Sequence, residues 1–412
     1  MQTPYGHLTY CTNIHPGENW PDHFAQLKKF IPAIKQQVSP DQPFGIGLRV
    51  ANSASLELAK EANLNAFKEW LKQEDCYVFT MNGFPYGGFH NVVVKDQVHT
   101  PDWTQADRVA YTIRLFRILA ALLPAGMEGG ISTSPLSYKY WCNRCEEEKN
   151  SFTESATLNM LLVVEQLARI HRSGGPLLHL DVEPEPDGLL ENTSEYISWY
   201  FEELLPYGIP FMKDKFDVDD QTAADMIKTH VQLCYDVCHF ALVYEAPQRV
   251  LERLQHHGLK IGKLQISAAL KADLPTGTDQ RKEVIDAFRK FNEPTYLHQV
   301  IARKKSGGFT HYPDLPEALA DAANEEIVEW RSHFHVPVFL DRFDVLQSTQ
   351  DDIVQTLALQ REKPFTSHME VETYTWDVLP AAYRQEMSLS VSRELNWIKQ
   401  QLNTGTVGIV TM

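Results

Sequence analysis

An excess of positive charge is the first thing this sequence lacks. Its 412 residues include 38 Lys and Arg against 54 Asp and Glu, which gives a formal net charge of −16. An acidic surface repels phosphate backbones, so the composition disfavours nonspecific binding to nucleic acid. We therefore expect no nucleic-acid partner.

Cysteines and long apolar runs are also scarce. Six cysteines in a chain of this length do not form a disulfide framework. Residues 1–5 have neither a basic nor an apolar character, and the longest apolar run, 118–123, ends at Pro124. That run is far too short to span a bilayer. We expect a cytoplasmic protein with reduced thiols and no membrane insertion, and the sequence leaves its oligomeric state open.

No internal repeat and no glycine-rich nucleotide-binding fingerprint is present, but strand-like and helical segments alternate. Amphipathic helical stretches cover 54–73, 104–123 and 155–172. Alternation of this kind predicts parallel strands joined by right-handed crossovers. Eight units favour an α/β fold of the (β/α)8 TIM-barrel type. The strand-like runs lie at 7–13, 44–50, 76–82, 126–132, 177–183, 231–236, 262–267 and 367–374.

The remaining long segments are assigned to loops and to one insertion. Segments 133–152 and 184–222 are polar and aromatic, and we predict long βα loops there. The interval 268–366 is the longest between assigned strands, so we predict an insertion before the last strand. It contains one further strand-like run at 333–340. No linker divides the chain, and we predict a single domain over 1–412.

Acidic and amide side chains end four of the predicted strands on the face that points into the barrel. They are Glu183, Asp236, Gln265 and Glu372, and Glu370 competes with Glu372, which lies further toward the mouth. Active sites of such barrels lie at these C-terminal strand ends. Because buried, unpaired carboxylates are costly, the pattern predicts a bound divalent cation of Mg, Mn or Zn type.

Other polar residues lie near the same predicted mouth and are candidates for binding a polar substrate. They are His15, Arg49, Asn82, His90, His239 and His333. Each has a structural alternative as a hydrogen-bonded residue of the core. The pair Cys142 and Cys145 forms one C-x-x-C motif, which lacks the two further ligands that a structural zinc site needs.

The motifs Glu183-Pro184, Asp236-x-x-His239 and Glu372-Thr373 resemble those of the xylose isomerase-like TIM barrels, which include sugar isomerases, ketose epimerases and endonuclease IV. More narrowly, the chain resembles the EboE family of metabolite-traffic proteins. The segments that carry this narrower resemblance lie at 8–20, 82–90, 179–188, 333–339 and 368–380.

The resemblance implies a metal held by Glu183, Asp236 and Glu372. Gln265 stands where these barrels have a histidine, and His335 is the candidate for the missing nitrogen ligand. The endonuclease-type Asp-x-His loop has His333-x-His335 as its nearest counterpart here, which argues against a trinuclear zinc site. The ketose epimerases imply that Glu183 and Glu372 are catalytic, as acid and base on opposite faces of an enediolate.

Three functions follow from these expectations. The first is a metal-dependent isomerase or epimerase, with hydrolysis second, that acts on a small polyhydroxylated or carbonyl metabolite. The second is a protein that binds or traffics such a metabolite without turnover, in keeping with the EboE resemblance. The third, phosphodiester hydrolysis, is disfavoured by the acidic composition. The sequence leaves open whether the protein is an enzyme.

Overall fold

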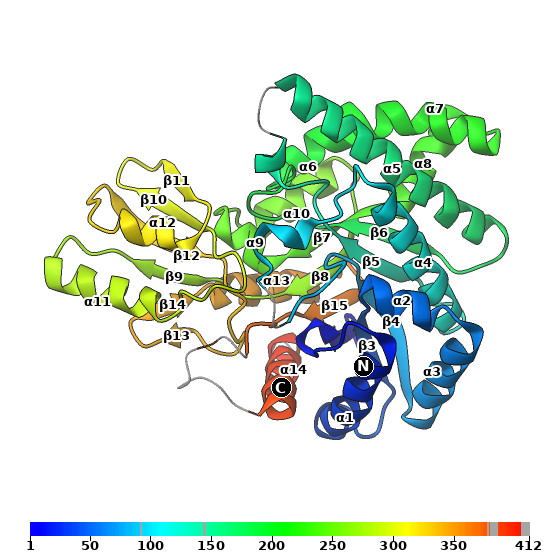
Figure 1. The fold of residues 1–412 in the computed structure, drawn as a ribbon, viewed down its shortest axis with the longest axis horizontal. Coiled ribbons are helices and arrows are strands. Elements are labelled where there is room, and N and C mark those ends of the chain that lie inside the picture. The colour runs from blue at the N-terminus through cyan, green and yellow to red at the C-terminus, as the bar shows by residue number, and fades with distance from the viewer. Residues whose placement is uncertain (91–92, 143–145, 377–378, 380–385, 405–412) are drawn as a thin grey trace, which may run out of the picture.

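Eight parallel strands form the centre of the molecule in the computed structural model, which describes all residues except 91–92, 143–145, 377–378, 380–385 and 405–412 (Figure 1). A short strand, β1 (Gln2–Thr3), pairs antiparallel with the first of them. The hydrogen-bonded order is β2-β15-β8-β7-β6-β5-β4-β3. The eight strands are β2 (Gly6–Tyr10), β3 (Phe44–Arg49), β4 (Cys76–Asn82), β5 (Gly129–Thr133), β6 (Leu178–Val182), β7 (Val231–Asp236), β8 (Ile261–Ile266) and β15 (His368–Val371).

The sheet closes between β2 and β3 through side-chain hydrogen bonds. Cys11 forms a parallel bridge with Gly47 just past the end of β2. The Thr9 hydroxyl donates to the carbonyl of Gly45 at 2.7 Å and accepts from the amide of Gly47 at 3.0 Å. These contacts replace part of a backbone ladder and join the two edge strands. The structure therefore confirms the α/β TIM-barrel prediction.

Helices form the outer layer, as expected for a parallel barrel. In α1 the side chain of Asn19 accepts from the amide of Asp22 at 2.9 Å, which caps the first turn, and Leu27, Ile31 and Ile34 are buried on the inner face. The helices of this layer are α1 (Trp20–Val38), α2 (Asn52–Leu58), α3 (Glu61–Gln73), α4 (Ala106–Leu122), α5 (Glu146–Arg172), α6 (Thr193–Trp199), α7 (Leu205–Phe216), α8 (Asp220–His230), α9 (Val237–Leu242), α10 (Pro247–His256), α13 (Gln350–Glu362) and α14 (Met387–Asn403).

A second sheet lies between β8 and α13 in the sequence and projects to one side of the barrel, at the left of Figure 1. Its six strands are antiparallel in the order β11-β10-β12-β9-β14-β13. The sequence predicts the insertion but not this sheet. Its elements are β9 (Leu270–Asp273), α11 (Thr278–Arg289), β10 (Val300–Lys304), β11 (Phe309–Tyr312), α12 (Leu315–Ala320), β12 (Ile327–Ser332), β13 (Arg342–Phe343) and β14 (Leu346–Ser348).

The prediction of a strand at 333–340 is wrong. The strand β12 ends at Ser332, and the following residues leave the sheet and run irregularly toward the barrel mouth. The amide of Val336 donates to the carbonyl of Ala268 at 3.0 Å instead of joining a ladder, and Pro337 has no amide proton to offer. The apolar alternation here reflects burial against the barrel rather than strand geometry.

The prediction of a long loop at 184–222 is also wrong, since most of that segment is helical. A cap at Asn192, which accepts from the amide of Glu195 at 3.1 Å, starts α6, and a π-helical turn at Tyr200–Leu204 leads into α7. The aromatic side chains that suggested a loop are buried helix faces, as Tyr196 illustrates. Likewise, α5 begins at Glu146, inside the predicted loop 133–152.

A buried ion pair lies inside the barrel below its mouth. Lys263 on β8 contacts the carboxylate of Glu370 on β15, and both side chains are fully buried. Gly47 on β3 leaves the space that this pair needs, because a Cβ atom there would lie 2.3 Å from Glu370 Oε1. The middle layer of the lumen is thus charged rather than filled by branched apolar side chains.

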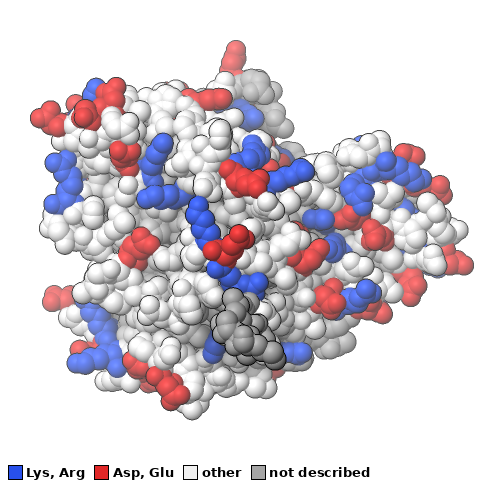
Figure 2. All heavy atoms as spheres, turned by 180° about the vertical axis from the view of Figure 1, so that it is seen from behind, with Lys and Arg blue, Asp and Glu red and all other residues white. Residues whose placement is uncertain are grey.

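The surface carries charges of both signs. Figure 2 shows acidic and basic side chains interspersed over one face, including the projecting lobe formed by the inserted sheet. None of the described helices is long and apolar enough to cross a membrane.

Candidate metal centre

A small cavity lies at the C-terminal ends of the strands, where sequence reasoning expects the site. Its volume is about 40 Å³, which has room for a cation or a few waters rather than for a sugar. Both the barrel and the insertion contribute to its walls. The lining residues are Asn13, Asn82, Phe84, Pro85, Phe89, Val98, Glu183, Glu185, His239, His333, His335, Glu372 and Tyr374.

Three carboxylates predicted as ligands meet beneath this cavity. Glu183 follows β6, Asp236 ends β7 and Glu372 follows β15, and one oxygen of each lies within 4.8 Å of the other two. All three side chains are buried. They share one layer because parallel strands end at the same edge of the barrel. Glu370, the competing ligand candidate, lies one layer lower on Lys263.

Gln265 fills the space between the three carboxylates. Its Nε2 atom lies 2.9 Å from Glu183 Oε1, 3.1 Å from Asp236 Oδ2 and 2.5 Å from Glu372 Oε2. An amide has two protons and so cannot donate to three acceptors at once. At least one of the three oxygens that face this amide therefore has no proton from it, and Glu183 Oε2 has no hydrogen-bond partner among the described residues, so the group fits a cation bound beside the amide.

The pKa values of the three carboxyls diverge. Burial, then the charge of Asp236, raises the pKa of Glu372 to about 8, and burial with Glu372 raises that of Glu183 well above its ordinary value. Burial acts in the same direction on Asp236, but His239 and His335 outweigh it and lower the pKa of this carboxyl. Asp236 is thus the member of the group that stays ionised.

A group of three imidazoles lies beside the carboxylates. His239 comes from α9, whereas His333 and His335 come from the irregular segment after β12. The Nε2 atom of His333 lies 3.2 Å from that of His239 and 3.3 Å from that of His335. Three ring nitrogens therefore face one another in a buried space.

The tautomers of His239 and His335 are fixed by backbone carbonyls. His239 Nδ1 lies 3.1 Å from the carbonyl oxygen of Pro184, and His335 Nδ1 lies 3.0 Å from that of Glu372. A carbonyl only accepts, so each Nδ1 carries the proton. Each Nε2 is then left with a bare lone pair.

The same holds for His333 through Gln299. The Gln299 amide nitrogen donates to the carbonyl of Pro186 at 3.1 Å, which turns its oxygen toward His333 Nδ1 at 2.8 Å. His333 Nε2 is therefore also bare and faces the bare Nε2 atoms of His239 and His335. Burial is the main cause that lowers the pKa of all three rings, that of His335 to about 4. Converging lone pairs repel unless a cation accepts them, so this group too fits a metal.

Asn82, at the end of β4, is a predicted substrate-binding residue that the structure places in the lining of the cavity. Its Nδ2 donates to Glu372 Oε1 at 2.8 Å. Asn13 donates to the same oxygen at 2.7 Å, and His90 Nε2 lies 2.6 Å from the carbonyl oxygen of Asn13. Asn82 and Asn13 hold the orientation of Glu372, and His90 is one residue removed from it.

Two predicted substrate-binding residues lie away from the cavity lining. His15 stacks on Phe30 with ring centroids 4.7 Å apart, and its Nε2 lies 2.7 Å from the hydroxyl of Tyr10. Arg49 donates to the carbonyl of Gly87 and lies 3.5 Å from Glu18 Oε1. Both side chains are buried in the packing around β2 and β3.

Sequence reasoning misses four residues at the centre. Asn13 ends the first strand-like run and Glu185 shares the face of Glu183, so position along the strand could have indicated both. Glu185 belongs with His239 and His333 to a group whose ligand atoms lie within 4.8 Å of one another. Gln299 and Tyr374 carry no comparable signal in the sequence.

An aromatic cover closes the cavity from outside. Phe89, Tyr296 and Tyr374 form a triangle with ring centroids 5.0–5.3 Å apart, and the Tyr296 hydroxyl donates to the carbonyl of Phe89 at 3.0 Å. The three rings come from the segment after β4, from the insertion and from the segment after β15. The insertion therefore completes both the imidazole group and the cover.

The C-x-x-C motif lies only partly within the described residues. Cys142 is buried, and its thiol points toward the carbonyls of Tyr138 and Lys139 at 3.8 and 3.5 Å. Cys145 lies outside the described residues.

A buried glutamate supports two segments of the centre, and a pH prediction arises from it. Glu394 on α14 accepts from the Thr373 hydroxyl at 2.7 Å and from the amide of Val338 at 3.1 Å. Burial raises its pKa to about 8.

Between about pH 4.5 and 8 the folded protein keeps a proton on Glu394 that the unfolded chain releases, so stability should fall as pH rises, by up to about 1.4 kcal/mol per pH unit. In urea titrations at pH 5.5 and 7.5, Glu394→Gln should flatten this slope, whereas Glu362→Gln at the exposed end of α13 should not.

Comparison with known proteins gives similarity of fold alone. No family model and no curated protein matches the chain. Solved structures that resemble it include 3-keto-D-glucoside 4-epimerase YcjR from E. coli (TM-score 0.46, 12% identity, 96% of this chain and 99% of that chain). A second is a xylose isomerase-like TIM barrel protein from Mycobacterium smegmatis in complex with magnesium (TM-score 0.48, 12% identity, 98% of this chain and 99% of that chain). A third is D-psicose 3-epimerase in the presence of D-fructose (TM-score 0.46, 11% identity, 96% of this chain and 99% of that chain). At these values the similarity carries no conclusion about activity.

Proposed function

We propose that this protein is a divalent-metal-dependent isomerase or epimerase of a small polyhydroxylated or carbonyl metabolite. The observation that carries the proposal is the convergence of three bare imidazole nitrogens, from His239, His333 and His335, beside a buried carboxylate group. Such a donor set is assembled at a cost in repulsion and desolvation that a cation offsets. The mixed nitrogen and oxygen donors favour Zn or Mn over Mg.

We propose that the ligands come from both the carboxylate group and the imidazole group. Glu183, Asp236, Glu372 and the three imidazoles are the proposed donors, and Gln265 is the predicted ligand that would need its amide oxygen turned inward. When bound, the metal supplies a Lewis acid that polarises a substrate carbonyl. Asn82 and Asn13 hold Glu372 in place by their hydrogen bonds to one oxygen, which leaves the other directed toward Gln265.

The two glutamates are the proposed proton carriers. Burial raises the pKa of Glu183 well above its ordinary value and brings that of Glu372 to about 8, so Glu372 can give or take a proton near neutral pH and Glu183 favours its protonated form. They come from β6 and β15, which are not neighbours in the barrel, and so approach the cavity from different sides. This arrangement suits proton removal on one face of a carbon and return on the other.

Proton exchange with solvent tests the proposal directly. Full-length protein loaded with Zn2+ or Mn2+ is incubated with a panel of ketoses and aldoses in D2O, and 1H NMR follows the loss of the C–H signal next to the carbonyl. We expect exchange with at least one sugar, and a loss of at least about 100-fold in Glu183→Gln and in Glu372→Gln, which is typical when a general acid or base is removed. Gln42→Glu, in an exposed turn, is a matched control.

A second candidate is a metabolite-binding protein without turnover, and the size of the cavity bears on both candidates alike. About 40 Å³ admits no sugar, whereas binding pockets for small ligands usually enclose several hundred Å³. A metabolite would have to displace the aromatic cover of Phe89, Tyr296 and Tyr374. Metabolite binding by calorimetry without any solvent exchange in the NMR experiment would identify this function, and it would agree with the EboE resemblance of the sequence.

We also propose that the barrel and the insertion form one domain. The insertion supplies His333, His335 and Tyr296 to a centre whose other residues come from the barrel, so neither part completes the site alone. A single calorimetric transition with equal calorimetric and van't Hoff enthalpies is expected. Two resolved transitions would assign the insertion to a separate domain.

A further inference from the structure

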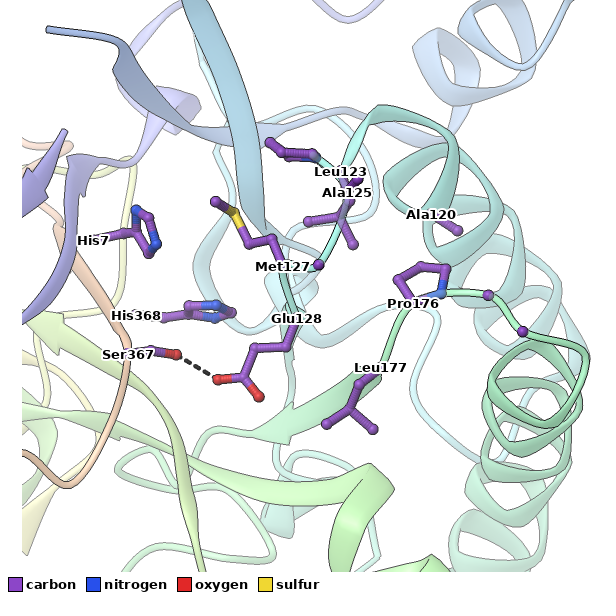
Figure 3. Close-up of a pocket in the computed structure, with 14 residues that line it drawn as sticks. His7, Ala120, Leu123, Ala125, Met127, Glu128, Pro176, Leu177, Ser367 and His368 are labelled. Carbon is purple, nitrogen blue, oxygen red and sulfur yellow. Dashed lines mark hydrogen bonds between the residues drawn. The ribbon is translucent and has the colours of Figure 1, made fainter.

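A second group of potential metal ligands lies at the opposite, N-terminal end of the barrel, and the centre described above does not use it. Glu128 precedes β5, His179 lies on β6 and His368 begins β15. One ligand atom of each lies within 4.8 Å of the other two. Figure 3 shows Glu128, Ser367 and His368 side by side at the wall of a cavity of about 750 Å³.

His368 is a buried imidazole whose hydrogen-bonding capacity is at most partly used. Its side chain is fully buried, and neither ring nitrogen has a hydrogen-bond partner of good geometry among the described residues, while a longer contact with the backbone of Glu128 acts to raise its pKa. Burial lowers its pKa well below the ordinary value, so the ring is neutral and keeps a lone pair. A buried polar group that is left unsatisfied is unfavourable unless a ligand accepts its lone pair.

His179 is oriented by a carboxylate behind it. Its Nδ1 lies 2.7 Å from Asp181 Oδ1, which leaves Nε2 as the available ligand atom. The neighbouring strands are built around this pair, because a Cβ at Gly262 would lie 1.9 Å from Asp181 Oδ1 and one at Gly130 would lie 2.3 Å from His179 Cε1. Carboxylate-backed histidines of this kind are typical second-layer support for a metal ligand.

Glu128 is likewise held in place at the edge of the cavity. The Ser367 hydroxyl donates to Glu128 Oε1 at 2.5 Å, as the dashed line in Figure 3 marks. A second cavity, of about 990 Å³, also reaches Glu128 and is lined by His179. Water and ions can therefore approach the group from outside the barrel, while His368 forms its inner wall.

We propose that Glu128, His179 and His368 form a second divalent-metal site, of the type that binds Zn2+ with two imidazoles, one carboxylate and a water. The metal would join β15 to the β5–β6 side across the end of the barrel, between strands that are not neighbours in the sheet. This site does not depend on the proposed function. His368 begins β15 and Glu372 directly follows its last residue, so the two residues are about 13 Å apart along the chain direction.

Anomalous diffraction locates the metal. Crystals of the full-length protein grown with Zn2+ should show a peak within about 2.6 Å of Glu128 and of both histidines. A peak at Glu372 alone, or at neither end, would overturn the proposal. Because the two positions are far apart, the same map shows separately whether metal is absent from the site at the barrel mouth or from the site at Glu128, His179 and His368.

The number of Zn2+ ions bound in solution provides a second test of the site. After removal of metal with a chelator, Zn2+ is titrated into the full-length protein and its variants. His368→Gln should lose one equivalent, and Glu128→Gln, at the accessible edge, should weaken that equivalent by at least about 10-fold. His7→Gln, a histidine of the same cavity whose Nδ1 lies 2.7 Å from the Tyr77 hydroxyl, should bind as the wild type does. An unchanged isotherm for Glu128→Gln refutes the site even if His368→Gln does not fold.

Discussion

Replacing Glu183 and Glu372 together by Gln is expected to abolish metal binding at the barrel mouth and, at alkaline pH, to make the metal-free protein more stable. Partners behind a metal ligand contribute about 10–100-fold to affinity, so loss of two direct ligands should weaken binding by more than about 100-fold. Without metal, the wild type holds three buried carboxylates around one amide with two protons. Burial raises the pKa of both glutamates, that of Glu372 to about 8, so the repulsion is complete only at alkaline pH. Above about pH 8, removing these charges should stabilise the metal-free protein by about 1–4 kcal/mol.

Elemental analysis and thermal unfolding measure the two effects. With an unfolding entropy of about 2.1 cal/mol/K per residue, the gain corresponds to about 1–5 °C in Tm for the metal-free variant. Added Zn2+ should raise the Tm of the wild type by binding at the barrel mouth. In the variant, the mouth site should add nothing to the Tm. A variant that retains the mouth metal, located by its anomalous signal, would show that the imidazoles hold it without these carboxylates. Lower stability of the metal-free variant would mean that the carboxylates form favourable bonds of their own.

The barrel could be predicted because its strands are buried on both faces and alternate strictly with helices. The alternation in 177–183 places His179, Asp181 and Glu183 on one face, and in the structure these side chains lie in three successive layers of the lumen. The inserted sheet escaped prediction for the opposite reason. Its strands are short, and charge pairs such as Arg303 with Glu329 interrupt the apolar alternation.

The centre could be predicted only in part. Residues at strand ends, Glu183, Asp236 and Glu372, follow from strand parity, because closure of the barrel forces them into one layer. Convergence of His333 with His239 depends instead on the path of the chain after β12, which no local pattern describes. The tautomers that leave their nitrogens bare depend on carbonyls far away in the sequence, such as that of Pro184.

Lys263→Met is expected to have the largest effect on stability. Burial favours the neutral amine, but Glu370 outweighs it and raises the pKa of Lys263 above its ordinary value, so the pair is ionic. Removing one partner of a buried ion pair leaves an uncompensated charge and costs about 3–5 kcal/mol. For this chain the loss corresponds to about 4–6 °C in Tm, measured by calorimetry on the metal-free protein.

A second substitution separates the charge from the packing. Because the cost arises from the isolated carboxylate, Lys263→Met with Glu370→Gln should recover most of the stability, and Glu370→Gln alone should be destabilising since it isolates the amine. If the double variant is no more stable than Lys263→Met, the lysine contributes through the hydrogen bond from its Nζ to the Ser132 hydroxyl at 3.3 Å and through its packing, and the ion pair adds nothing. Recovery would instead mean that the barrel keeps a positive charge directly below the carboxylate group, where it partly offsets the repulsion among Glu183, Asp236 and Glu372.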